Sequence, residues 1–209
     1  MNKIFSIMKT APDDVLWAFS SDIHTLIMDK YFSQVWEDNT HVFEYSNREN
    51  VSRMVNDLNP ESVIDVGCGF NKYKETVKCS DFVGIDPFNP AADVKKGVYE
   101  YQNANPDKQF DVVLALGSIN FGTKEKILAE IESVDKLTKS GGTQFWRVNP
   151  NTKHNYHPDF PLNELLTWYD WDEEFIRHVA EIYNYEIKDI KEEVNDQGYK
   201  RLFFVFYKY

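Results

Sequence analysis

Short runs of apolar and β-branched residues recur along the chain and alternate with stretches of helical periodicity. Residues 123–137 place apolar side chains at every third or fourth position, which predicts an amphipathic helix, and Ser140-Gly-Gly142 predicts a left-handed C-cap after it. Alternating strands and helices of this kind predict an α/β fold built on a parallel sheet. The segments that read as buried strands are 63–66, 82–86, 110–117 and 143–148.

The C-terminal part of the chain follows a different pattern. An acidic helix start at 172–174 precedes two segments that read as strands, 185–194 and 199–207. The sequence Asn-Asp-Gln-Gly between them favours a hairpin turn. The second segment is apolar throughout 202–206, which predicts an interior strand, whereas the charges of the first place it at an edge. The sheet is therefore expected to end in an antiparallel hairpin.

Residues 1–50 differ from the remainder of the chain in being rich in aromatic residues without strand-like runs. A helix is predicted over 22–37 and a second one over 46–58, which Pro60 ends just before the first strand. Two interpretations of the first fifty residues stay open: a helical cover that buries its own core against the sheet, or a lid over a substrate. The chain is accordingly divided into an N-terminal cover or lid, 1–50, and a core, 51–209.

Composition limits the classes of partner. A chain of 209 residues is long enough for one α/β domain and a modest appendage. Its net charge of -11 disfavours bare nucleic acid as a partner, because phosphate binding relies on a basic face. No apolar run approaches the roughly 20 residues of a membrane span. The two cysteines, Cys68 and Cys79, are not expected to pair, which fits a reducing, cytoplasmic setting.

The first predicted strand carries the most specific motif. It runs into Gly67-x-Gly69, where the glycines permit a sharp turn and the close approach of a ligand to the backbone. Asp86 closes the second predicted strand. A glycine turn after one strand and a carboxylate at the tip of the next is typical of a site for a nucleoside with free ribose hydroxyls. A dinucleotide fingerprint would require a third glycine at the position of Lys72.

The sequence Asp65-x-Gly67-x-Gly69 resembles motif I of the class I S-adenosylmethionine-dependent methyltransferases. Asn71 stands where that family usually has a third glycine, and asparagine tolerates left-handed backbone angles. The resemblance extends over residues 51–209. It implies a Rossmann-like, mostly parallel seven-stranded sheet with an antiparallel C-terminal hairpin strand, helices on both faces and an N-terminal helical cover. It also implies S-adenosylmethionine as the cofactor.

The resemblance assigns roles to individual residues. Asp65 would accept a hydrogen bond from the cofactor ammonium, and Asp86 would bind both ribose hydroxyls. The segment 87–92 is too short and proline-rich for the family's usual helix, so a third strand from Asp93 and a loop over 89–100 both stay open. The full set of predicted cofactor-binding residues is Asp65, Gly67, Cys68, Gly69, Asp86, Pro87, Phe88, Val98, Tyr99, Leu116, Gly117 and Ser118.

Methyl transfer from a sulfonium needs alignment above all, and no residue is assigned as the catalytic base. The acceptor is expected to be a small molecule or a protein side chain. Two alternatives stay open: a catalytically silent domain that serves as a binding or scaffold protein, and an NAD-linked enzyme. The polar and aromatic loop 146–158 is long enough to cover a substrate. Its pair His154 and His157 lacks the accompanying ligands of a recognised metal site, and no metal is predicted.

Overall fold

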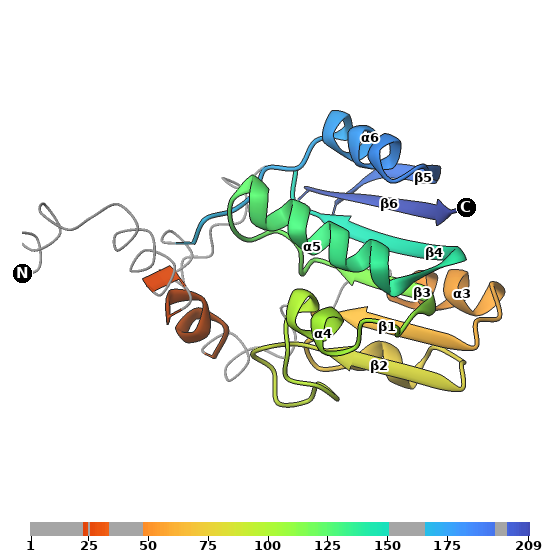
Figure 1. The fold of residues 1–209 in the computed structure, drawn as a ribbon, viewed down its shortest axis with the longest axis horizontal. Helices are drawn as coiled ribbons and strands as arrows, with labels where there is room; N and C mark the ends of the chain where they lie inside the picture. The colour runs from red at the N-terminus through yellow and green to blue at the C-terminus, as the bar shows by residue number, and fades with distance from the viewer. Residues whose placement is uncertain (1–22, 25, 34–47, 151–165, 195–199) are drawn as a thin grey trace, which may run out of the picture.

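The computed structural model describes residues 23–24, 26–33, 48–150, 166–194 and 200–209. Within them six strands form one mixed sheet in the order β2-β1-β3-β4-β6-β5 (Figure 1). The first four strands of this order pair in parallel, and β6 is antiparallel to both of its neighbours. The strands are β1 (Ser62–Val66), β2 (Asp81–Ile85), β3 (Phe110–Leu116), β4 (Thr138–Val148), β5 (Tyr185–Val194) and β6 (Lys200–Lys208).

Helices cover both faces of the sheet, as predicted. Helices α4, α5 and α6 lie on one face and α3 on the other (Figure 1). A further helix, described at 23–24 and 26–33, lies at the carboxyl ends of the parallel strands, and the rest of the predicted N-terminal cover is outside the described residues except for 48–50 at the start of α3. The labelled helices are α3 (Arg48–Asp57), the single 3-10 turn η1 (Lys72–Glu75), α4 (Val98–Ala104), α5 (Lys124–Leu137) and α6 (Glu173–Ile182). Among the described residues no helix is both long and apolar enough to cross a bilayer.

The core consists of two layers, one on each face of the sheet. Alternate residues of a strand point to opposite faces, so Ile64 belongs to the core layer on the face of α4, α5 and α6, while Val63 belongs to the layer on the face of α3. In the C-terminal hairpin the predicted interior strand is confirmed, because Phe203 to Phe206 of β6 are almost fully buried. Its partner β5 forms the edge of the sheet and carries the more exposed, charged residues.

The expectation of seven strands is wrong for the described residues, because the segment after β2 makes only one bridge to the sheet. Val94 pairs with Ile85, and the Val94 N–H donates to the Gly84 carbonyl at 3.2 Å. Two prolines in the segment 87–92 have no N–H to donate, so an extended ladder does not form there. Of the two alternatives, the loop with only a rudimentary third strand is the one observed up to Gly97. The predicted loop is wrong for 98–100, because these residues belong to helix α4, which starts at Val98.

The C-cap predicted at Ser140-Gly-Gly142 is also wrong. Helix α5 ends earlier, at Leu137, and the chain enters β4 directly at Thr138. Gly141 does have a left-handed φ of 78°, but it lies inside β4, where the pairing with β3 shifts register. The glycine pair therefore serves an irregularity in a strand, which glycine marks as often as it marks a helix end.

The Asp93 carboxylate takes over one hydrogen bond from β2 that a full third strand would accept, and it also binds two side chains from the segment after β1. Its Oδ2 accepts from the Gly84 N–H at 2.9 Å and from Asn71 Nδ2 at 3.1 Å, and its Oδ1 pairs with Lys74 Nζ at 2.5 Å. Partial burial raises the pKa of Asp93, but the hydrogen bonds from Lys74, Gly84 and Asn71 outweigh this effect and hold it below its ordinary value. The outer side of β2 is thus satisfied by a side chain.

This arrangement predicts that Asp93→Ala destabilises the fold. The Gly84 N–H and the Asn71 amide would lose their acceptor, so we expect the free energy of unfolding to fall by about 1–3 kcal/mol. Urea unfolding measures the change. The matched control is Asp189→Ala, which removes an exposed ion pair with Lys191 at 3.5 Å and is expected to change stability by less than about 0.5 kcal/mol. Equal stabilities of the two variants would contradict the role given to Asp93.

Candidate functional site

A cavity of about 660 Å³ opens at the carboxyl ends of β1, β2 and β3. Ligands of open α/β sheets bind at this edge, and small-molecule sites commonly measure about 300–1,000 Å³. The structure brings all the residues singled out from the sequence to the wall of this one cavity. They are Asp65, Gly67, Cys68, Gly69, Asp86, Pro87, Phe88, Val98, Tyr99, Leu116, Gly117 and Ser118.

The glycine turn after β1 is fixed by backbone geometry. Gly67 has a φ of +69°, and a Cβ added there would lie 2.2 Å from the Ser118 Cβ. Glycine is therefore required at this position both by the left-handed angle and by the close approach of the β3 loop. The N–H groups of Gly67 and Cys68 both donate to the Ile85 carbonyl, at 2.7 and 3.0 Å. These contacts hold the ends of β1, β2 and β3 together around the cavity.

Asn71 adopts the left-handed conformation that the sequence predicted, with φ 58° and ψ 30°. Its side chain also has a packing role, because it lies against the strand at Gly84, where a Cβ would come within 2.2 Å of Asn71 Oδ1. The amide nitrogen of Asn71 donates to Asp93. Asparagine thus supplies the backbone angle of the missing glycine and, in addition, links the glycine turn to the segment after β2.

Asp86 lies at the tip of β2 and organises the loops around it. Its Oδ1 accepts from the N–H groups of Phe88 and Asn89, at 2.8 and 2.9 Å, and its Oδ2 accepts from the Gly69 N–H at 3.1 Å. The side chain lines the cavity although the residue is only 5% exposed. A carboxylate offers about four lone-pair positions, so it retains capacity for a ligand beside the three N–H donors.

Asp65 also lines the cavity, from the end of β1, and its electrostatic state differs from that of Asp86. It is 3% exposed, and its carboxyl makes no hydrogen bond to any residue in the described part of the chain. Burial, and then the nearby charge of Asp86, raise the pKa of Asp65 to about 8. The carboxyl is therefore protonated at neutral pH, and a cation entering the cavity would convert it to the anion.

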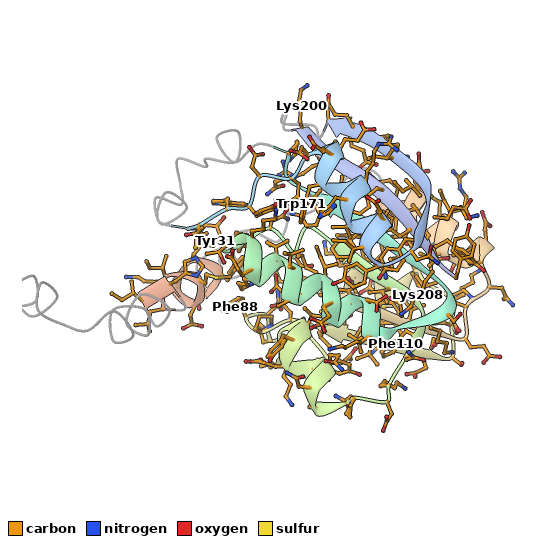
Figure 2. The ribbon with its side chains drawn as sticks, turned by 45° about the horizontal axis from the view of Figure 1, so that its top comes forward. Tyr31, Phe88, Phe110, Trp171, Lys200 and Lys208 are labelled. Atoms are coloured by element: carbon orange, nitrogen blue, oxygen red, sulfur yellow. The ribbon has the colours of Figure 1, made fainter. Side chains whose placement is uncertain are left out.

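Aromatic side chains close the cavity on the side of the N-terminal helix. Phe32 stacks on Phe88 with ring centroids 4.9 Å apart and meets Phe121 edge to face at 5.2 Å. Phe121 in turn contacts Trp168 at 4.3 Å. Figure 2 shows Tyr31 and Phe88 at this end of the molecule and Phe110 at the other. The helix over 23–33 thus buries apolar side chains and at the same time forms a wall of the cavity.

Several cavity residues were not identified from the sequence. Arg147 of β4 is 1% exposed, and its Nε donates to Glu193 Oε2 at 3.0 Å. Asn149 follows the same strand and is 4% exposed. Both lie within 146–158, which the sequence singled out as a loop able to cover a substrate, but neither was given an individual role, and Arg147 belongs to β4 rather than to a loop. Lys126, Glu130 and Trp168 are further examples.

Three aromatic residues just before α6, Trp168, Tyr169 and Trp171, are predicted by their sequence context to be packing residues rather than a stacking surface for a ligand. Trp171 fits this interpretation, since it is 1% exposed and its Nε1 donates to the Ile119 carbonyl at 3.0 Å. Trp168 instead lines the cavity. His154 and His157 lie outside the described residues. Within the described residues no group of three or more histidine, cysteine or acidic side chains is arranged to hold a metal ion.

The state of Asp65 makes stability depend on pH. The pKa of this carboxyl is about 8 in the folded chain, against an ordinary value of 3.8, so the folded state binds the extra proton between these values and the free energy of unfolding falls as pH rises. Asp65→Asn removes this titration. The variant and the parent are expected to have the same free energy of unfolding at pH 4. At pH 8 the variant's value should be higher by on the order of a few kcal/mol.

Urea unfolding at a series of pH values tests this expectation. Asp57→Asn, a change at an exposed position of α3, serves as the control and should keep the parent's pH profile. A constant stability difference between parent and Asp65→Asn across the range would show that Asp65 titrates normally.

Comparison with solved structures identifies similar folds. The 1,6-didemethyltoxoflavin-N1-methyltransferase of Burkholderia thailandensis superposes with a TM-score of 0.69 at 14% identity, covering 90% of this chain and 89% of that one. The N-methyltransferase NodS of Bradyrhizobium japonicum WM9, in complex with S-adenosylhomocysteine, gives a TM-score of 0.60 at 10% identity, covering 85% and 98%. The magnesium protoporphyrin IX methyltransferase of Synechocystis PCC 6803 with bound S-adenosylmethionine gives a TM-score of 0.56 at 13% identity, covering 78% of this chain and 78% of that one.

Comparison of the sequence with protein-family models and with curated proteins finds no match. The structural similarity agrees with the antiparallel β6 between β4 and β5, which the sequence had predicted as a methyltransferase feature. At 10–16% identity the similarity establishes the architecture. The chain has the α/β fold of the class I S-adenosylmethionine-dependent methyltransferases.

Proposed function

We propose that this protein is an S-adenosylmethionine-dependent methyltransferase acting on a small molecule or a protein side chain. The observation that carries the proposal is that Asp65 and Asp86 line one cavity together with a glycine turn of left-handed backbone angles, within this fold. The cavity is lined by the loops that follow three parallel strands. An enclosed site of this size favours a small molecule over a folded protein as acceptor.

The residues present fit the cofactor. The buried Asp65 carboxyl has no hydrogen-bond partner among the described residues, and a ligand ammonium would supply one. Asp86 would accept from a ribose hydroxyl, and Phe88 would lie beside the adenine ring. The absence of a Cβ at Gly67 lets the loop that carries Ser118 pack directly on the glycine turn, which brings the loops after β1 and β3 together at the cavity. Leu116, Gly117 and Ser118 would then lie next to the reacting centre.

The cofactor would supply a methyl group already activated on a sulfonium sulfur. The chemistry it would supply is transfer of that methyl group to a lone pair of the acceptor, with the electron pair of the carbon–sulfur bond left on sulfur. The chain's contribution is alignment, for which well-oriented reactions gain up to about 7–11 kcal/mol. The helix over 23–33 would act as a lid within an N-terminal region, 1–50, that covers the core, 51–209. Its aromatic side chains would exclude water from the reacting atoms.

The neighbours in structure support a small-molecule acceptor. One of them is described with bound 1,6-didemethyltoxoflavin and S-adenosylhomocysteine, and another is a magnesium protoporphyrin IX methyltransferase. A silent scaffold would not need a cavity that gathers two carboxyls and a glycine turn. Binding experiments distinguish an active methyltransferase from a silent scaffold, because the enzyme must bind the cofactor and the scaffold need not.

The first test is calorimetric titration with S-adenosylhomocysteine and NAD. We expect the former to bind and the latter to show no binding at millimolar concentration. Because the pKa of Asp65 is about 8 in the empty cavity, binding of the ligand ammonium at pH 7 should release close to one proton. Titrations in phosphate and in Tris, which differ in ionisation enthalpy, measure this proton. Asp65→Asn should abolish the release. Binding of NAD in preference to S-adenosylhomocysteine would overturn the proposal.

The second test concerns the ribose. Because Asp86 also accepts three backbone N–H bonds, Asp86→Ala loosens two loops as well as removing a ligand contact. Comparing adenosine with 2′,3′-dideoxyadenosine separates the two effects. The parent should prefer adenosine by roughly 10- to 150-fold, the value of one hydrogen bond to a charged group, and Asp86→Ala should lose this preference. A preference that survives in the variant would mean that another residue binds the ribose.

A further inference from the structure

We propose that the methyl acceptor is a planar nitrogen heterocycle with a lactam-type edge, meaning a ring N–H beside a ring carbonyl. One of its faces would pack on the aromatic wall that contains Phe121 and Trp168, and its edge would pair with the Asn149 carboxamide. This inference rests on the proposed function and specifies the substrate class of the same cavity. It is carried by two independent features of the described residues: an aromatic wall held in place by backbone hydrogen bonds, and a buried amide without a partner.

The aromatic wall is built from segments that the backbone holds together. Phe121 and Trp168 form an antiparallel bridge, and their rings lie 4.3 Å apart between centroids. The Gly122 N–H donates to the Thr167 carbonyl at 2.7 Å, next to this bridge. Phe32 then meets Phe121 edge to face, from the N-terminal helix. Aromatic walls that are already ordered bind flat rings well, because little conformational freedom is lost on binding.

Asn149 provides the polar group of this end of the cavity. Its backbone is fully used by the fold: the N–H donates to Asn120 Oδ1 at 2.9 Å, and the carbonyl accepts from the Trp171 N–H at 3.1 Å. Its side chain lines the cavity in a residue that is 4% exposed, yet it makes no hydrogen bond to any residue that the structure describes. Buried amides are normally paired, so this carboxamide is a site for a ligand.

A carboxamide carries a donor and an acceptor side by side. The complementary partner is a group with the same pair in reverse, such as the N–H and C=O of a lactam. The charged groups at the cavity do not favour a cationic acceptor. Asp65 and Asp86 belong to the proposed cofactor side, Glu130 is paired with Lys126 at 2.5 Å, and the buried Arg147 lies two residues before Asn149. A neutral ring fits this environment better than an ammonium.

The position of Asn149 also suits methyl transfer. The Asn120 side chain connects it to the loop after β3, because Asn120 Nδ2 donates to the Gly117 carbonyl at 2.8 Å while Oδ1 accepts from the Asn149 N–H. Gly117 and Ser118 are the residues expected beside the transferable methyl group. The Asn120 side chain therefore fixes the backbone of Asn149 relative to the proposed reacting centre, and both residues are nearly inaccessible to solvent.

The test uses 2-quinolinone and its fully saturated analogue octahydro-2-quinolinone, two neutral lactams with the same edge. Each is titrated calorimetrically into the protein saturated with S-adenosylhomocysteine. We expect 2-quinolinone to bind at least about tenfold more tightly, because only the flat ring can lay one face on the aromatic wall. Trp168→Leu should reduce that preference. Asn149→Leu should weaken 2-quinolinone binding by about two- to tenfold, while S-adenosylhomocysteine affinity stays within about twofold.

Each other outcome has a defined meaning. Equal affinities of the two lactams, or tighter binding of the saturated one, would overturn the aromatic class. Absence of binding by both at millimolar concentration would overturn the site, and an unchanged 2-quinolinone affinity in Asn149→Leu would overturn the role of the amide. If S-adenosylhomocysteine itself fails to bind, the proposed function falls. In that case the two lactams are titrated into the protein without S-adenosylhomocysteine. Their relative affinities, and the effects of Trp168→Leu and Asn149→Leu on them, then test the acceptor site independently of the cofactor.

Discussion

The hydrogen bonds to the Asp86 carboxylate are the interaction on which the cavity depends. Three backbone N–H groups, from Gly69, Phe88 and Asn89, point at one nearly buried carboxylate. Burying a charge without such partners is strongly unfavourable, and charge-assisted bonds to N–H groups compensate for it. Because the donors come from the glycine turn and from the loop after β2, the same carboxylate sets the distance between these loops. The shape of the proposed cofactor site follows from that distance.

The charge of Asp86 then determines the state of its neighbour. Two carboxyls in one poorly hydrated cavity cannot both ionise easily, and the raised pKa of Asp65 reflects burial together with this repulsion. The two carboxyl groups are consequently suited to different parts of a ligand. Asp86, surrounded by N–H donors, is suited to neutral hydroxyls, whereas Asp65, without partners in the described chain, is suited to a cation that brings the missing positive charge. Residues of the same type differ here because their surroundings differ.

Much of the fold could be predicted because it is encoded in short-range patterns. The buried runs of β1 and β3, the capped helix α5 and the apolar β6 are visible in sequence, since period and turn chemistry involve neighbouring residues. The end of α5 could not be placed, because Gly141 has the left-handed angle of a cap but uses it inside β4. The number of strands depended on whether 87–97 would pair with β2. Only one bridge formed, at Val94, and the Asp93 carboxylate accepts the Gly84 N–H next to it.

The candidate site likewise contains residues that could be predicted from the sequence and residues that could not. Asp65, Gly67 and Asp86 could be found because each follows a strand at a fixed spacing. The wall formed by Phe32, Phe88, Phe121 and Trp168 could not, because its members come from distant segments and only contact geometry brings them together. Asn120 and Asn149 illustrate why residue type alone is insufficient. Asn120 uses its side chain to hold backbone groups, whereas Asn149 is held by its backbone and keeps its side chain for the cavity. A ligand-binding role is assigned to Asn149 by the hydrogen bonds that the fold has already made, and those bonds exist only once β4, the β3 loop and Trp171 have come together.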